Sequence, residues 1–244
     1  MNWIKTKPIA HRGLHSNENG IPENSLLAFN EAIKKKYPIE LDIHLIADNN
    51  FAVLHDDNLE RMCGKNIKVK GLTSLQLKEY NLLSTQEKIP FLQEVFNLVN
   101  GQVPLLIEIK SCGRNKKGLR CLYNLLSSYN GAFAIQSFNP FIVSWFAVNA
   151  PSILRGQLAS NFEKIKISYI SKILLKYFLL NFISKPHFIS YDFDDMPNKR
   201  VEKLRKSGKN ILCWTITSEK EYKKIQPFCE NIIFEKFLPQ YNSN

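Results

Sequence analysis

The chain alternates short runs of apolar, β-branched residues with longer stretches whose apolar residues recur at helical spacing. Such a stretch spans residues 25–36, between a Pro-Glu-Asn start and a Lys-rich end. The runs that predict strands lie at about 7–11, 38–45, 104–110, 132–138, 153–158, 187–193, 210–215 and 230–235. Strand followed by helix, repeated, predicts a parallel sheet. Eight such units in 244 residues favour an α/β fold of the (β/α)₈ TIM-barrel class over an open doubly wound sheet.

One segment interrupts this alternation. Residues 46–88 hold a short extended piece at 51–55, a polar, turn-rich stretch and a small helix near 74–80. We interpret the segment as a small insertion after the second strand. Because no internal repeat, linker or Ser/Gly-rich boundary divides the chain, we expect residues 1–244 to form a single domain.

Composition narrows the class of protein. An apolar content of 44% with 23% charged residues excludes a disordered chain. The formal net charge of +11 indicates an anionic partner, which could be a nucleic acid, a phosphorylated small molecule or an acidic membrane surface. The basic residues are scattered and carry no nucleic-acid-binding signature with interleaved aromatic residues, so we do not expect a nucleic-acid partner.

The cysteines and the N-terminal residues bear on the cellular compartment in which the protein is expected. There is no Cys-x-x-Cys pair and no apolar signal segment near the N-terminus, so we expect a cytoplasmic protein without disulfides or a thiolate metal site. No stretch reaches the roughly 18 uncharged apolar residues of a membrane span. Reduced, mostly buried thiols are expected at Cys63, Cys112, Cys121, Cys213 and Cys229.

Polar residues collect where predicted strands end, which is where the chemistry of a barrel is placed. The first strand ends in His11-Arg12-Gly13, the second carries Glu40 and Asp42, the extended piece ends in His55-Asp56, and the third ends in Glu108-Ile109-Lys110.

Glu40 and Asp42 are two residues apart on a strand, so both side chains project from one face, which in a barrel is the interior. Confined carboxylates repel one another, and Glu108 on the neighbouring strand adds a third. A hard divalent cation, Ca²⁺ or Mg²⁺, would relieve this repulsion and leave positions for water and phosphate oxygens. The alternative is a structural network of salt bridges with Lys110 and Arg12.

His11 and His55 both end strand-like runs, which predicts two imidazoles at one opening. General acid-base cleavage needs this layout, because one group takes a proton from the nucleophile and the other gives one to the leaving oxygen. Arg12 has the fork geometry that suits a phosphate, and Lys110 can act as a point charge. The other histidines rank lower: His15, His44 and His187.

The blocks IAHRG, PENSLLAFNEAI, IELDIHL, FAVLHD, GLTSLQLKEYN, IPFLQEVFNLV, LLIEIK, QSFNP and CWTI resemble, in this order and spacing, the glycerophosphodiester phosphodiesterase family from about residue 8 to 217. The resemblance implies a (β/α)₈ barrel that hydrolyses glycerophosphodiesters to glycerol phosphate and an alcohol. It implies metal ligands at Glu40, Asp42 and Glu108, an acid-base pair at His11 and His55, phosphate contacts from Arg12 and Lys110, a pocket wall at Trp214 and a bracing residue at Glu23.

Residues 163–183 mix bulky apolar residues with lysines, a composition typical of helices that lie in a membrane interface. We expect weak attachment to anionic membranes through this segment. The alternative is a barrel helix whose apolar side belongs to the core. Two other functions remain open at this point: lysophospholipase D-type hydrolysis of a lysolipid at the membrane surface, and a non-catalytic anion-binding barrel. The oligomeric state is not predicted.

Overall fold

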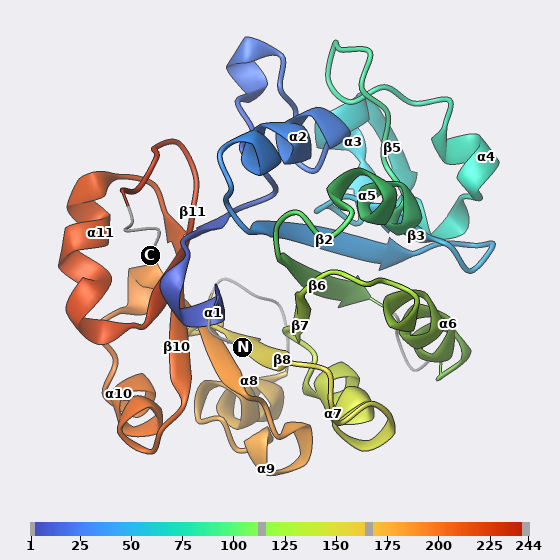
Figure 1. The fold of residues 1–244 in the computed structure, drawn as a ribbon. Coiled ribbons are helices and arrows are strands. Elements are labelled where there is room, and N and C mark those ends of the chain that lie inside the picture. The colour runs from blue at the N-terminus through green and yellow to red at the C-terminus, as the bar shows by residue number, and fades with distance from the viewer. Residues whose placement is uncertain (1–2, 112–115, 164–167, 241–244) are drawn as a thin grey trace. The chain divides into compact units, whose positions relative to one another are not determined.

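Each of the eight predicted strand positions holds a strand in the computed structural model, which describes residues 3–111, 116–163 and 168–240 (Figure 1). These strands are β1 (Ile9–Ala10), β2 (Ile39–Leu45), β6 (Leu105–Ser111), β7 (Phe133–Ser137), β8 (Arg155–Ala159), β9 (Phe188–Asp192), β10 (Asn210–Ile216) and β11 (Asn231–Phe234). The chain divides into two units. We call Ala10–Phe133 the N-terminal unit, and Met1–Ile9 with Ala134–Asn244 the C-terminal unit.

The α-helices alternate with these strands along the chain. They are α1 (Trp3–Thr6), α2 (Leu26–Lys34), α3 (Glu60–Cys63), α4 (Ser74–Leu77), α5 (Leu92–Val99), α6 (Lys116–Ser127), α7 (Pro140–Asn149), α8 (Tyr169–Lys176), α9 (Asn181–Ser184), α10 (Lys199–Lys206) and α11 (Glu219–Ile225). The described residues contain no helix that is both long and apolar enough to cross a membrane.

In the N-terminal unit, β2 is the central strand. It pairs in parallel with β1 and with β6, and antiparallel with the short strand β3 (Phe51–Val53). The predicted helix at 25–36 is confirmed as α2, which begins at Ser25 because the Ser25 hydroxyl accepts a hydrogen bond from the Ala28 N–H at 3.1 Å. Ile39, Leu41 and Ile43 of β2 are buried apolar residues, so the strand contributes one face to the core.

Residues 46–88 fold into several small elements. Besides β3, they form a two-stranded sheet of β4 (Asn58–Leu59) and β5 (Lys65–Lys68), the helix α3 and the helix α4. The predicted small helix is α4, which begins after the N-cap Thr73. A cluster of buried apolar residues holds these elements together: Ile46, Ala52, Leu54, Leu59, Met62, Val69, Leu77, Leu82, Ile89 and Phe91.

In the C-terminal unit, β7 to β11 pair in parallel in chain order, each with the next. One or two helices separate each strand from the following one, so this unit is a regular βα array. Gly156 of β8 is required by packing, because a Cβ at this position would collide with the ring of Phe188 on β9. Cys213 and Cys229 are buried free thiols, Cys63 and Cys121 are half-buried, and Cys112 lies outside the described residues.

Candidate active site

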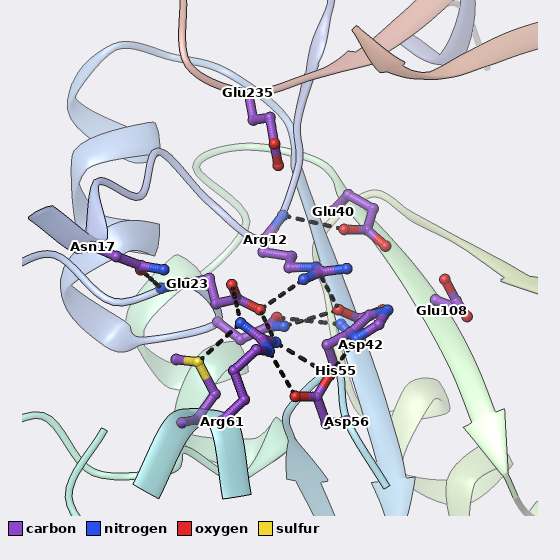
Figure 2. Close-up of polar contacts among 12 residues, drawn as sticks. Arg12, Asn17, Glu23, Glu40, Asp42, His55, Asp56, Arg61, Glu108 and Glu235 are labelled. Carbon is purple, nitrogen blue, oxygen red and sulfur yellow. Dashed lines mark hydrogen bonds and ion pairs between the residues drawn. The ribbon is translucent and has the colours of Figure 1, made fainter. Parts of the chain in front are cut away.

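Three buried carboxylates lie together in the N-terminal unit. Glu40 and Asp42 alternate along β2, and the parallel register places Glu108 of β6 directly opposite Asp42. One oxygen of each carboxylate lies within 4.8 Å of the others, and all three residues are buried (Figure 2). The period of two along β2 and the pairing with β6 therefore bring together the acids that the sequence singled out.

The three acids differ in how readily they ionise. Burial raises the pKa of Glu40 well above its usual range, and the neighbouring Asp42 and Glu108 raise it further. Burial also raises the pKa of Glu108, to about 7, although Lys110 opposes the change. Burial alone would raise the pKa of Asp42, but Lys110 and Arg12 hold it well below its usual range. A buried set of oxygen ligands that is only partly neutralised fits a hard divalent cation.

Lys110 follows Glu108 by two residues on β6, so both side chains project from one face, and a bulge lies at Lys110. The register between β2 and β6 shifts by one residue after Ile109, so Lys110 is an extra residue in its strand. Its Nζ lies 2.9 Å from Asp42 Oδ1 and 2.7 Å from Glu108 Oε1. Burial would lower the pKa of the ammonium, but these two carboxylates raise it above its usual value. Lys110 therefore stays charged inside the cluster.

The turn after β1 places Arg12 at the same position. Arg12 and Gly13 both adopt left-handed backbone conformations, with φ of 55° and 81°. Gly13 needs its small size as well, because a Cβ there would lie 2.8 Å from the carbonyl carbon of Ala28 in α2. A left-handed arginine is uncommon, and such strain is typical of functional sites. The His-Arg-Gly motif is thus a tight turn that lies against α2.

Arg12 makes contacts with three acids (Figure 2). Its backbone N–H donates to Glu40 Oε2 at 3.1 Å, its Nη1 donates to Glu23 Oε1 at 2.7 Å, and its Nε lies 3.3 Å from Asp42 Oδ2. Glu23 thus contacts the guanidinium, and its bracing role in the site stays a prediction. The half-buried cation stands beside the carboxylate cluster, where a phosphate could be bound.

Asn24 is a site residue that sequence reasoning missed. Its Nδ2 donates to Asp42 Oδ2 at 2.9 Å, and its Oδ1 accepts from the Asp42 N–H at 3.3 Å. The side chain is fully buried, and the backbone φ is 55°. Asn24 is the last residue of the Pro-Glu-Asn start of α2, where the sequence pattern indicates a helix boundary and gives Asn24 itself no role.

His55 is positioned by the backbone and by a carboxylate. The N–H of Leu54 donates to the carbonyl of Asp42 at 3.1 Å, so the chain emerges from β3 beside the acids. His55 Nδ1 lies 2.7 Å from Asp56 Oδ1. If Nδ1 donates this hydrogen bond, Nε2 is the proton acceptor of the neutral ring. Burial lowers the pKa of His55 and favours this neutral form, while the charge of Asp42 opposes the change.

Arg61 of α3 contacts residues on both sides of the site, and no sequence pattern singles it out. Its Nε donates to Asp56 Oδ2 at 2.7 Å. Its Nη1 and Nη2 both donate to the Glu23 carboxylate, each at 2.8 Å. Because Glu23 binds Arg12 and Asp56 binds His55, one guanidinium connects the candidate phosphate-binding residue to the candidate acid-base residue (Figure 2).

The remaining histidines differ in how close they lie to this cluster. His11 directly follows β1, and the charges of His11 and His55 both help to lower the pKa of Asp42, so both imidazoles lie near this carboxylate. A ring nitrogen of His15 lies within 4.8 Å of one of His11. His44 is buried behind His55, and its Nε2 lies 3.1 Å from the His55 carbonyl oxygen.

Trp214 belongs to the C-terminal unit, on β10. Its ring packs edge-to-face against Phe138, with 5.7 Å between the ring centroids. Its indole Nε1 is buried and has no hydrogen-bond partner among the residues that the structure describes. Its role as a pocket wall stays a prediction.

Comparisons with known proteins agree with the resemblance. The model of the glycerophosphoryl diester phosphodiesterase family matches residues 11–230. A glycerophosphodiester phosphodiesterase of Caldanaerobacter subterraneus subsp. tengcongensis is 27% identical over 91% of this chain and 90% of its own. Lysophospholipase D GDPD1 of Homo sapiens is 31% identical over 51% of this chain and 42% of its own.

Solved structures agree as well. The structure of a phosphodiesterase from Oleispira antarctica in complex with the product sn-glycerol-3-phosphate has a TM-score of 0.79 with this chain at 22% identity, and the match covers 95% of this chain and 93% of that one. The fold class is the (β/α)₈ barrel, as the sequence predicted. The chain is a phosphoric diester hydrolase. It belongs to the glycerophosphoryl diester phosphodiesterase family.

Proposed function

We propose that this protein hydrolyses glycerophosphodiesters to glycerol phosphate and an alcohol, with His11 and His55 as the acid-base pair. The observation that carries the proposal is the gathering of both imidazoles, two further acids and two cations around one buried carboxylate, Asp42. Family membership and the product complex of the Oleispira antarctica phosphodiesterase support the substrate class.

A divalent cation, Ca²⁺ or Mg²⁺, fits this site. Glu40, Asp42 and Glu108 would hold it, because their buried oxygens lie within 4.8 Å of one another. Burial, and after it the charge of the neighbouring carboxylates, raises the pKa values of Glu40 and Glu108, and a cation would offset both effects. When bound, the cation supplies positive charge that stabilises the phosphate oxygens as negative charge develops on them.

Arg12 and Lys110 bind the phosphate in this proposal. Lys110 is a compact charge between Asp42 and Glu108, whereas the planar guanidinium of Arg12 can present two parallel N–H donors to a phosphate. Glu23 holds Arg12 in place through the 2.7 Å contact. Trp214 is proposed to line the pocket for the alcohol part of the substrate.

The two histidines move the protons. One imidazole accepts the proton of the attacking hydroxyl, from water or from the glycerol 2-hydroxyl, as the new P–O bond forms. The other imidazole donates a proton to the departing alkoxide oxygen as its P–O bond breaks. Each group contributes about 10²–10⁴-fold to the rate. Asp56 holds the His55 ring by the 2.7 Å contact with Nδ1, which orients Nε2 for either role.

A second candidate is hydrolysis of a lysolipid by the same residues. Two observations favour it: the similarity to lysophospholipase D GDPD1 of Homo sapiens, and the exposed apolar side chains Tyr169 and Ile170 on α8. The reaction is the same phosphodiester cleavage, so only the attached acyl chain separates the two substrates.

The experiment is an assay of choline release from glycerophosphocholine and from lysophosphatidylcholine, with Mg²⁺ or Ca²⁺ present. We expect turnover of glycerophosphocholine, loss of turnover after EDTA treatment, and recovery when one of the two cations is added back. Turnover that is indifferent to EDTA would contradict the carboxylate site. Binding of glycerol phosphate without turnover of either substrate would favour a non-catalytic barrel. Faster release from the lysolipid would favour the second candidate.

A further inference from the structure

The helix α8 of the C-terminal unit is amphipathic in sequence, yet none of its residues is buried. Tyr169 and Ile170 are 78% and 70% exposed, and Tyr177, directly after the helix, is 50% exposed. The spacing of Ile170, Leu174 and Tyr177 places them on one side of the helix. A helix with an apolar side normally buries that side against the core. In α8 the two ends of this side, Ile170 and Tyr177, are exposed, and Leu174 between them is only half-buried.

Neighbouring elements also carry exposed apolar residues. On α7, Phe141 and Val148 are 66% and 76% exposed and lie two helical turns apart on one side. Helices α7 and α9 lie side by side (Figure 1). Most of the strongly exposed large apolar residues that the structure describes fall on these elements, which we call the α7–α9 surface: Phe141, Val148, Tyr169, Ile170, Tyr177, Leu179 and Phe182.

The turn between α8 and α9 is anchored by one buried residue, Phe178, and the apolar residues on either side of it face outward. Phe178 is buried, with its ring centroid 6.0 Å from that of Tyr191 on β9. Its neighbours Tyr177 and Leu179 are each half exposed. Phe178 adopts a left-handed φ of 56°, a conformation that bulky residues rarely hold without tertiary support. Anchoring Phe178 therefore presents the residues on either side of it to solvent.

The charge around this surface is mainly positive. Glu163 is the one acidic residue in the sequence between residues 109 and 191. Lys172 and Lys176 lie on α8, and the Lys176 Nζ is 3.7 Å from the Glu163 carboxylate. Arg200 adds a guanidinium over the ring of Tyr177, 4.2 Å from its centroid. Exposed aromatic and aliphatic side chains are thus combined with cations.

We infer that the α7–α9 surface docks on an anionic lipid bilayer, where its apolar side chains enter the interface and its lysines contact the headgroups. Bulky apolar residues next to lysines are the composition of interfacial helices, and the scarcity of acids over residues 109–191 complements an anionic leaflet. A surface for a second copy of this chain would instead bring like charges together. This inference does not rest on the proposed hydrolysis, because docking needs no turnover.

The test is flotation of the full-length protein with vesicles of phosphatidylcholine containing about 30% phosphatidylglycerol, compared with vesicles of phosphatidylcholine alone. We expect salt-sensitive binding to the anionic vesicles. The double variant Ile170→Ser/Phe182→Ser should weaken binding at least about tenfold, because its apolar insertion is lost. Lys172→Gln and Lys176→Gln should each weaken binding about fivefold.

A matched control is Leu75→Ser, which removes an apolar residue of similar exposure, 78%, from α4 of the N-terminal unit. It should bind vesicles like the wild type. Circular dichroism of each variant, compared with the wild type, shows that the variants are folded. Absence of vesicle binding by the wild type, or equal binding by the Ile170→Ser/Phe182→Ser variant, would overturn the inference. So would a wild-type dimer in light scattering that this variant converts to a monomer, because the surface would then pair two copies.

Discussion

Two regions of this protein reverse the usual distribution of residues, and they do so in opposite directions. At the strand ends of the N-terminal unit, charged side chains such as Asp42 and Glu40 are buried. On the α7–α9 surface of the C-terminal unit, apolar side chains such as Phe182 and Ile170 are exposed. Folding alone favours neither arrangement, because buried charges lose hydration and exposed apolar groups gain nothing from the core.

The two regions differ in what compensates the free-energy cost of burying charged groups or exposing apolar ones. The buried acids have partners within the chain, since Lys110 and Arg12 contact Asp42, and Arg61 contacts Glu23. The exposed apolar residues have no comparable cover among the described residues, which is why we infer a partner outside the chain. The comparison teaches that a buried polar network marks the site of a reaction. An exposed apolar surface instead marks a place where another molecule binds.

The largest expected effect tests the buried region. Replacing His11 or His55 with Ala should lower kcat for glycerophosphocholine by about 10²–10⁴-fold, because each removes a proton-transfer group. Initial rates of choline release measure the effect, and circular dichroism checks the fold. His187→Ala is the matched control, since His187 of the C-terminal unit accepts a hydrogen bond from the Arg155 N–H and should not alter turnover. Rates within a few-fold of wild type for both active-site variants would contradict the assignment.

A smaller effect is expected at Arg61, which acts through Asp56 and Glu23. Arg61→Ala should lower kcat by about 10–100-fold, the usual cost of removing a residue that orients a catalytic group. Glu60→Ala, an exposed neighbour on α3, is the control. If Arg61 acts by holding Asp56, the double variant with Asp56→Asn should lose little more kcat than either single variant. Additive losses would show that Arg61 works in another way.

The smallest effect concerns stability. Burial alone would raise the pKa of Glu23, but Arg61 and Arg12 lower it from 4.5 to about 2. A carboxyl with a depressed pKa stabilises the fold above its unfolded pKa and loses this contribution as pH falls through its folded pKa. Glu23→Gln should therefore lower the free energy of unfolding at neutral pH by up to about 3 kcal/mol.

The pH dependence tests this assignment. The difference between wild type and Glu23→Gln in urea unfolding should shrink between pH 4.5 and about 2. Phe182→Ser is the control from the other region, and because it is 73% exposed it should change stability by no more than about 0.5 kcal/mol at any pH. A constant difference for Glu23→Gln across this range would contradict the ion pairs with Arg12 and Arg61.

Much of the fold could be predicted because the spacing of apolar residues indicates which side chains are buried. The strand pattern located β2 and β6 to within a residue at each end, and alternation along β2 placed Glu40 and Asp42 on one face. A parallel sheet then required Glu108 to lie near them. These features follow from backbone geometry, which the local spacing of apolar and polar residues indicates.

Contacts between distant side chains were not predictable in the same way. Arg61 is 38 residues from Glu23, and nothing in its local pattern distinguishes it from a solvated arginine on a small helix. The β4–β5 pair was missed because β5 is fully exposed and has no apolar alternation. The composition of residues 163–183 fitted either an interfacial helix or a core helix, so only the structure could show that the residues of α8 are not buried.

The arginine shared between Glu23 and Asp56 has a mechanical consequence. Because α3 carries Arg61, a rigid displacement of this short helix would pull on the guanidinium of Arg12 through one carboxylate and on the imidazole of His55 through the other. Substrate binding and proton transfer would then be disturbed together. A molecule that binds residues 46–88 and displaces α3 would therefore affect both functions at once.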